Sequence, residues 1–244
     1  MTLQTRVRRA GEMVAAESAL RRRGEDGLAR AVAMSYRGRL PAAEAEWAER
    51  IERVRVDLEA CNDALDRDGR TVADVTRSGS KRRREASMLM ALVRTERPAS
   101  VIEMGTCVGI SGAYLAAALR LNGNGVLVTL ERGAERVGLA RQVWADLGLA
   151  DLVDARVGRF ANTLAPALSD QEPVDFLFVD GHHERVPTLE FYAAAGPHLR
   201  AGALVVFDDI RWSDGMREAW ADIERQPDQQ FAVKVGDIGI VRRT

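Results

Sequence analysis

The stretch VIEMGTCVGIS, residues 101–111, decides the fold. An apolar run passes through Glu103 and is followed by Gly105 and Gly109, after which a helix-forming segment begins. The first glycine lets the backbone turn sharply, and the second lets a ligand approach the start of the helix. The spacing offers a poorer pyrophosphate cradle than GxGxxG and lacks the GK[ST] of a P-loop. We therefore predict a strand, a ligand-facing turn and a helix.

The same alternation continues through the remainder of the chain. Short apolar runs predict strands, and amphipathic segments between them predict helices. Strands that are apolar throughout and alternate with helices indicate a parallel sheet covered on both faces. The expected fold is a doubly wound, Rossmann-like α/β domain with a mostly parallel sheet and a C-terminal antiparallel hairpin. The predicted strands are 99–105, 125–131, 153–158, 174–181 and 203–209, the predicted helices include 111–123, 134–149 and 214–224, and the closing hairpin is 231–243.

Residues 1–75 predict an N-terminal helical extension, and residues 76–244 the α/β domain. Within the extension, apolar side chains recur at spacings of four and three residues, which gives a heptad-like seam. The seam consists of Trp47, Ile51, Val54, Leu58, Cys61 and Leu65. It either packs on the main domain or forms a subunit interface, and we predict a homodimer.

Composition excludes several classes of protein. A net charge of −1 and short basic runs such as KRRR at 81–84 do not indicate a nucleic-acid binder. Cys61 and Cys107 lie far apart, which excludes a zinc-finger site. No apolar run approaches the length of a membrane span, and no apolar signal core is present at the N-terminus, so a soluble cytoplasmic protein is expected. Only Lys81 and Lys234 are lysines, which leaves almost no place for a catalytic lysine.

Candidate ligand-binding residues follow from the sheet. In an open parallel sheet, ligands bind beyond the carboxyl ends of the strands. The candidates are Glu103–Gly105, Glu131, Gly158–Phe160, Asp180–His183 and Asp208–Asp209. A carboxylate at Glu131 suits the two hydroxyls of a ribose, although a plain helix cap is the alternative.

Three of these candidates are aspartates. Asp208 and Asp209 adjoin in VVFDDIRW (205–212), and Asp180 ends the preceding strand. Adjacent buried carboxylates repel each other unless a cation joins them, and oxygen ligands suit Mg²⁺ or a similar divalent ion. The alternative is that one aspartate caps a helix and another contacts a cofactor, without a metal.

Taken together, VIEMGTCVGIS, VLVTLE (126–131), FLFVDGHH (176–183) and VGDIGIV (235–241) resemble the class I S-adenosylmethionine-dependent methyltransferases. The similarity is to the catechol and caffeoyl-coenzyme-A type of O-methyltransferase and to bacterial enzymes acting on antibiotic sugars. It spans roughly residues 78–242.

The resemblance implies roles for individual residues. Glu103 and Gly105 would line the methionine and ribose side of the cofactor, Ser111 would hold the methionine carboxylate, and Glu131 would bind the ribose. The full implied cofactor-binding set is Glu103, Gly105, Thr106, Gly109, Ser111, Glu131, Gly158, Arg159, Phe160 and Asp180, with Gly158, Arg159 and Phe160 bordering the adenine. The implied metal ligands are Asp180, Asp208 and Asp209.

Two adjacent histidines follow Asp180. Catechol-type enzymes have a lysine base at the position of His183, and the sugar-type relatives have an aspartate at that of His182. Both positions here hold a group suited to general-base work. Which of the two acts as the base is left open, and the alternative is a pair of turn histidines without a catalytic part.

The expected function is S-adenosylmethionine-dependent O-methylation of a small-molecule hydroxyl, on a phenol, catechol or natural-product sugar, assisted by a divalent metal. The alternatives are a metal-independent small-molecule methyltransferase and a non-catalytic protein that binds the cofactor or serves in assembly.

Overall fold

The computed structural model describes residues 3–66 and 68–244, with side chains from residue 10 onward; residues 1, 2 and 67 of the predicted extension lie outside this part. The helices are α1 (Leu3–Arg21), α2 (Asp26–Tyr36), α3 (Ala42–Ala60), α4 (Val72–Gly79), α5 (Arg83–Glu96), α6 (Ile110–Asn122), α7 (Ala134–Leu147), α8 (Phe160–Gln171), α9 (Arg185–Ala195) and α10 (Asp214–Glu224). The strands are β1 (Ser100–Met104), β2 (Val126–Glu131), β3 (Val153–Val157), β4 (Val174–Val179), β5 (Leu199–Phe207), β6 (Gln229–Val235) and β7 (Ile238–Arg243).

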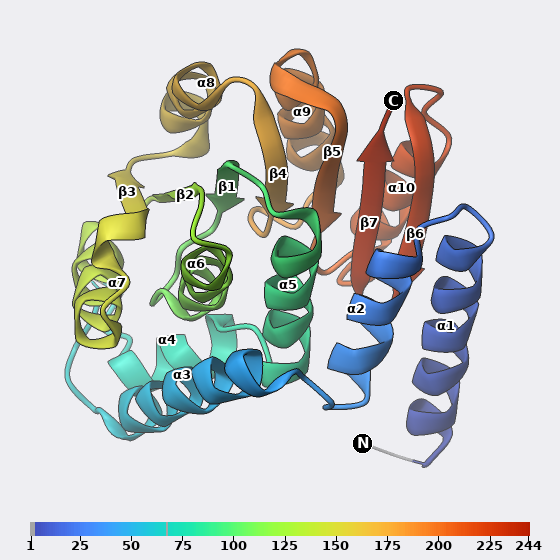
Figure 1. Cartoon of the computed structure of the whole chain (residues 1–244). Coiled ribbons are helices and arrows are strands. Elements are labelled where there is room, and N and C mark those ends of the chain that lie inside the picture. Colours follow the sequence, from blue (N-terminus) through green and yellow to red (C-terminus); the bar gives the residue numbers. More distant parts are fainter. Residues whose placement is uncertain (1–2, 67) are drawn as a thin grey trace.

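The strands form one sheet in the order β3-β2-β1-β4-β5-β7-β6. The first five of these run parallel, and β7 and β6 add an antiparallel edge (Figure 1). In register, Ile102 of β1 lies beside Val128 of β2 and Leu177 of β4. The predicted Rossmann-like fold with a closing hairpin is therefore confirmed.

Helices cover both faces of the sheet. Figure 1 shows α5, α6 and α7 on one face and α8, α9 and α10 on the other. Successive residues of β1 belong to different cores: Val101 lies in the core that also contains α6, and Ile102 in the core that also contains part of α8. Because side chains alternate along a strand, a central strand with two covered faces is apolar at most of its positions. That preference explains the continuous apolar runs in the sequence.

The N-terminal helices pack on the α/β domain. α1 contacts β6, α2 contacts α5, and α3 crosses α6. Ile51 of the predicted seam is fully buried in the same core as α6. The seam is shorter than predicted, because α3 ends at Ala60 and Cys61 is already extended, so Leu65 lies in the following turn. The seam therefore packs within the chain, whereas the homodimer and the division at residue 75 stay predictions.

Among the described residues, no helix combines the length and the apolar character needed to cross a membrane.

Candidate functional site

Backbone hydrogen bonds continue the sheet one residue beyond the ends of its strands. The amide of Asp180 donates to Met104 O at 2.9 Å, and that of Asp208 donates to Val179 O at 2.9 Å. The amide of Gly158 donates to Glu131 O, also at 2.9 Å. These bonds bring the predicted candidates together along the carboxyl edge.

A hollow of about 660 Å³ opens along this edge. Six members of the predicted cofactor set line it: Gly105, Glu131, Gly158, Arg159, Phe160 and Asp180. His182 also lines it, and its ring packs against both Phe160, with centroids 5.7 Å apart, and Phe191, with centroids 5.5 Å apart. These three rings form an aromatic wall, and the same lining includes the carboxylates of Glu131 and Asp180.

Glu131 is held in a fixed orientation. Its Oε2 accepts the amide of Cys107 at 3.1 Å, and its Oε1 accepts the amide of Gly133 at 2.9 Å. Each carboxylate oxygen can accept more than one hydrogen bond, so both keep capacity for a ligand hydroxyl. The two backbone bonds orient the carboxylate before any ligand binds.

The other four residues of the predicted cofactor set lie outside the lining of this hollow. Thr106 is fully buried, and its hydroxyl pairs with that of Thr129 at 2.6 Å. At Gly109, a Cβ would lie 2.8 Å from Cβ of Ala140 on α7. The missing side chain of Gly109 makes room for α7, and its predicted role in ligand approach stays a prediction. Glu103 and Ser111 are buried beneath the turn.

Glu103 is 0% exposed. Thr129 Oγ1 donates to its Oε2 at 2.7 Å, while Oε1 has no hydrogen-bond partner among the described residues. Burial raises the pKa of Glu103 to about 8, against the opposing effect of hydrogen bonds from Ser111 and Thr129. A buried carboxyl with a free oxygen is a ready acceptor for a ligand N–H group.

Glu103 should therefore make stability fall with rising pH. Between the ordinary glutamate pKa of 4.5 and the folded value of about 8, the folded state binds more protons than the unfolded state. Stability then declines across this range, by up to about 1.4 kcal/mol per pH unit. In Glu103→Gln this contribution is absent. As the pH rises from about 5 to 8.5, the melting temperature of the variant should therefore fall less than that of the wild type. Equal pH dependence in calorimetric scans of both proteins would contradict the assignment.

The three predicted metal ligands also come together, but around a lysine. Nζ of Lys81 contacts Oδ2 of Asp208 and lies 3.3 Å from Oδ1 of Asp180 and 3.9 Å from Oδ2 of Asp209. Sequence reasoning missed this residue, because it treated KRRR at 81–84 only as a short basic run and left almost no place for a catalytic lysine. The one available signal was the pair of adjacent aspartates, which requires a nearby cation.

The two histidines point in different directions. Nε2 of His183 lies 3.6 Å from Oδ1 of Asp180 and 3.8 Å from Oδ2 of Asp209. His182 faces the aromatic wall described above. Both have positive φ angles, 64° for His182 and 47° for His183, a conformation that is uncommon outside glycine and often marks functional sites.

The acidic cluster is mostly buried. Asp208 is only 3% exposed, and burial raises the pKa of Asp180, while the charges of Lys81 and His183 lower it. One ligand atom each from Asp180, His183 and Asp209 lie within 4.8 Å of one another. Beside them Trp212 is 72% exposed, with its ring 6.3 Å from that of His183. The cluster thus combines largely buried charged groups with an exposed aromatic side chain, that of Trp212.

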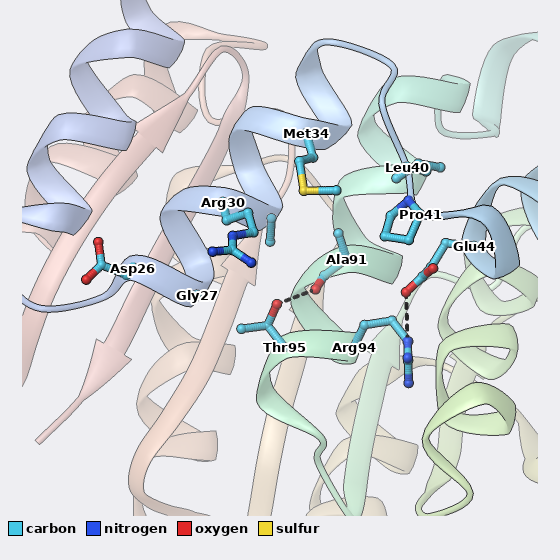
Figure 2. Close-up of a pocket in the computed structure, with 11 residues that line it drawn as sticks. Asp26, Gly27, Arg30, Met34, Leu40, Pro41, Glu44, Ala91, Arg94 and Thr95 are labelled. Carbon is cyan, nitrogen blue, oxygen red and sulfur yellow. Dashed lines mark hydrogen bonds and ion pairs between the residues drawn. The ribbon is translucent and has the colours of Figure 1, made fainter.

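A second hollow, of about 470 Å³, lies between α2, α3 and α5 (Figure 2). Its acids are already paired: Glu44 with Arg94 at 2.9 Å, and Asp26 with Arg21 at 3.0 Å. Its lining contains no histidine or cysteine. It therefore offers no evident base or nucleophile, and the candidate active site is the carboxyl edge of the sheet.

Residues 102–210 match a family described as a methyltransferase domain. This part of the chain is similar to that family. The matched range begins in β1, contains the glycine turn and Glu131, and ends just beyond Asp208 and Asp209. The matched range thus contains the edge that the geometry singles out.

Relatives that are similar to about half of the chain are named as O-methyltransferases. A catechol O-methyltransferase from Niastella koreensis is 28% identical over 127 residues, which are 52% of this chain and 56% of that protein. The chain spans about half the length of the curated relatives it matches.

Solved structures share the fold. O-methyltransferase TomG from Streptomyces achromogenes, involved in tomaymycin synthesis and in complex with S-adenosylmethionine, superposes with a TM-score of 0.59 at 24% identity, over 84% of this chain and 91% of that one. An O-methyltransferase from Bacillus cereus in complex with S-adenosylhomocysteine gives 0.62 at 20% identity, over 82% and 91%. The predicted resemblance to the S-adenosylmethionine-dependent O-methyltransferases is confirmed.

Proposed function

We propose that this chain is an S-adenosylmethionine-dependent O-methyltransferase that acts on a hydroxyl of a small molecule, on a phenol, a catechol or a sugar of a natural product. One observation carries the proposal. The hollow that contains Glu131 adjoins a cluster in which His183 faces two carboxylates, and both lie at one edge of the sheet. A cofactor site beside a histidine that can accept a proton suits methyl transfer to a hydroxyl.

The cofactor would lie along the hollow. Glu131, oriented by two backbone amides, would accept the ribose hydroxyls. Phe160 and His182 would flank the adenine, with Gly158 and Arg159 beside it. At the other end, the unpartnered oxygen of Glu103 would accept a hydrogen bond from the methionine ammonium.

The reaction would be a direct displacement. The acceptor oxygen attacks the methyl carbon, so an O–C bond forms while the C–S bond breaks and S-adenosylhomocysteine leaves. The hydroxyl proton passes to Nε2 of His183. This assigns the base role to His183, since His182 is turned into the aromatic wall. The main contribution of the fold is alignment of oxygen, methyl and sulfur.

Trp212 bears on the class of acceptor. A large exposed indole next to His183 offers a flat apolar surface on which an aromatic ring or a sugar ring can lie. This supports a ring-bearing acceptor.

The divalent metal predicted from the sequence does not fit the residues as they lie. Asp180, Asp208 and Asp209 do converge, but the ammonium of Lys81 contacts Asp208 and faces oxygens of the other two. A second cation beside it would meet direct repulsion. No step of the proposed reaction therefore passes through a metal, and the predicted metal-independent alternative gains support.

Titration calorimetry with S-adenosylmethionine tests the proposal, followed by a transfer assay against a panel of catechols, phenols and glycosides. We expect cofactor binding by the wild type and a Kd at least about tenfold weaker in Glu131→Ala, because a ribose contact to a charged acceptor is lost. Glu46→Ala, an exposed position on α3, is the matched control and should bind as the wild type.

Two negative results are informative. Absence of cofactor binding in the wild type would remove the proposal altogether. Binding without transfer to any panel member would favour the non-catalytic alternative, a cofactor-binding or assembly protein.

A further inference from the structure

The acidic cluster of Asp180, Asp208 and Asp209 already contains a cation. The chain has two lysines. Lys234 lies at the surface and pairs with Glu224 at 3.4 Å, with its side chain 47% exposed. The side chain of Lys81 is only 11% exposed, and its ammonium faces all three carboxylates. Lysine is rarely buried unless it is paired, so this placement is specific.

Two N-terminal helices, α3 and α4, hold the backbone at Lys81 in place. It follows α4, whose start is fixed by a reciprocal pair of bonds between Thr71 and Asp74. Its carbonyl accepts Nη2 of Arg55 at 2.5 Å, and Arg55 is itself buried on α3.

α4 is in turn packed against the turn after β1. A Cβ on Gly79 would lie 2.8 Å from Sγ of Cys107, and Thr76 is fully buried. The segment that carries Lys81 is therefore fixed relative to the site. The side chain of Lys81 reaches the acidic cluster from a backbone position that packing holds in place.

We propose that the ammonium of Lys81 is the resident cation of this cluster and takes the place of a divalent metal ion there. Besides its contact with Asp208, Nζ faces two oxygens that a metal would use, Oδ1 of Asp180 at 3.3 Å and Oδ2 of Asp209 at 3.9 Å, and both oxygens also face His183. A Mg²⁺ ion needs oxygen ligands at about 2.1 Å in octahedral geometry. An ion bound to those two oxygens would sit against Nζ, so metal and lysine exclude each other.

The chemical role assigned to Lys81 rests on the proposed function. An ammonium supplies one positive charge and N–H donors beside the acceptor oxygen, where it stabilises a developing alkoxide or phenoxide. It supplies less charge than a divalent ion. This favours acceptors that ionise readily, such as phenols and catechols, over aliphatic sugar hydroxyls.

Metal binding tests the inference without any transfer assay. Mn²⁺ is titrated into the wild type, Lys81→Met and Lys234→Met, with free Mn²⁺ followed by electron paramagnetic resonance. We expect a Kd of about 1 mM or weaker for the wild type and for Lys234→Met. For Lys81→Met we expect Mn²⁺ binding at least about tenfold tighter, because the carboxylate oxygens no longer face the ammonium of Lys81 and can bind the ion.

Removal of Lys81 leaves buried carboxylates without their partner and can impair folding. The double variant Lys81→Met, Asp208→Asn removes the cation together with the carboxylate it contacts, and keeps Asp180, His183 and Asp209 as donors. It should gain Mn²⁺ binding as well. Circular dichroism and S-adenosylmethionine titration of each variant report folding and the proposed function separately.

Tight Mn²⁺ binding by the wild type, with a Kd of about 100 µM or below, would overturn the inference. So would folded Lys81 variants that bind Mn²⁺ no better than Lys234→Met. If the wild type binds no S-adenosylmethionine but Lys81→Met gains Mn²⁺, the proposed function fails while the assignment of Lys81 as the resident cation stands.

Discussion

Replacement of His183 by alanine should lower kcat by about 10²- to 10⁴-fold, the usual contribution of a general base. Nε2 of His183 faces Asp180 and Asp209 at 3.6 and 3.8 Å, so a proton taken from the acceptor would be stabilised by two carboxylates. The alanine variant loses the proton acceptor and keeps the cofactor hollow, because His183 does not line it. Its Kd for S-adenosylmethionine should stay within about threefold of the wild-type value.

The other two histidines of the chain provide matched controls. His198→Ala should leave kcat unchanged, since His198 pairs with Glu172 at the far end of α9. His182→Ala should chiefly weaken cofactor binding, by a few-fold, because its ring packs against Phe160 and Phe191 in the hollow. Rates are measured on the acceptor that the wild type methylates fastest. Full activity of His183→Ala, or a larger loss of kcat in His182→Ala, would assign the base elsewhere.

Much of the fold could be predicted because the central strands are covered on both faces. β4 and β5 are apolar throughout in their buried parts, and β1 is apolar apart from Ser100 and Glu103. Such runs separated by helices are visible without any structure. The N-terminal helices were harder to predict. The seam of α3 continues in the sequence as far as Leu65, but the helix ends at Ala60, since periodicity does not report where the chain turns away.

The candidate site could be located for a geometric reason, and its details could not. Parallel strands bring their carboxyl ends to one edge, so Glu131, Asp180 and Asp208 had to lie along the same edge of the sheet. Lys81 is about a hundred residues from Asp180 in sequence and reaches it only through the docking of α4. The choice between His182 and His183 depends on two left-handed backbone conformations, which no residue pattern specifies.

Gly105→Ala should be among the most damaging single changes in the chain. A Cβ at this position would lie 2.0 Å from the carbonyl oxygen of Asp180, and φ is +113°. The clash is with backbone, so a side-chain rotation cannot relieve it. β1 and β4 would have to separate where the edge binds its ligands. We expect the free energy of unfolding to fall by more than about 3 kcal/mol, a large loss of the kind that severe overpacking of a protein interior causes.

Two glycines separate the clash from other effects of adding a methyl group. Gly123→Ala also has a positive φ, +67°, but nothing lies within 4 Å of the added Cβ, so it should cost only about 1–2 kcal/mol of left-handed strain. Gly138→Ala, exposed within α7 with open space around it, should stabilise the protein by about 0.5–1 kcal/mol. Urea unfolding of the three variants gives the differences directly.

Cofactor titration of the same variants links the strain to function. Gly105 lines the hollow, and its amide donates to Leu130 O at 3.0 Å. A displacement of the backbone at Gly105 would therefore also displace Asp180 and the turn that connects β1 to α6. Gly105→Ala should lose S-adenosylmethionine binding even under conditions where it is folded, whereas Gly123→Ala should keep it. If Gly105→Ala unfolds like Gly123→Ala and binds the cofactor normally, the close approach of β1 and β4 cannot be what shapes the site.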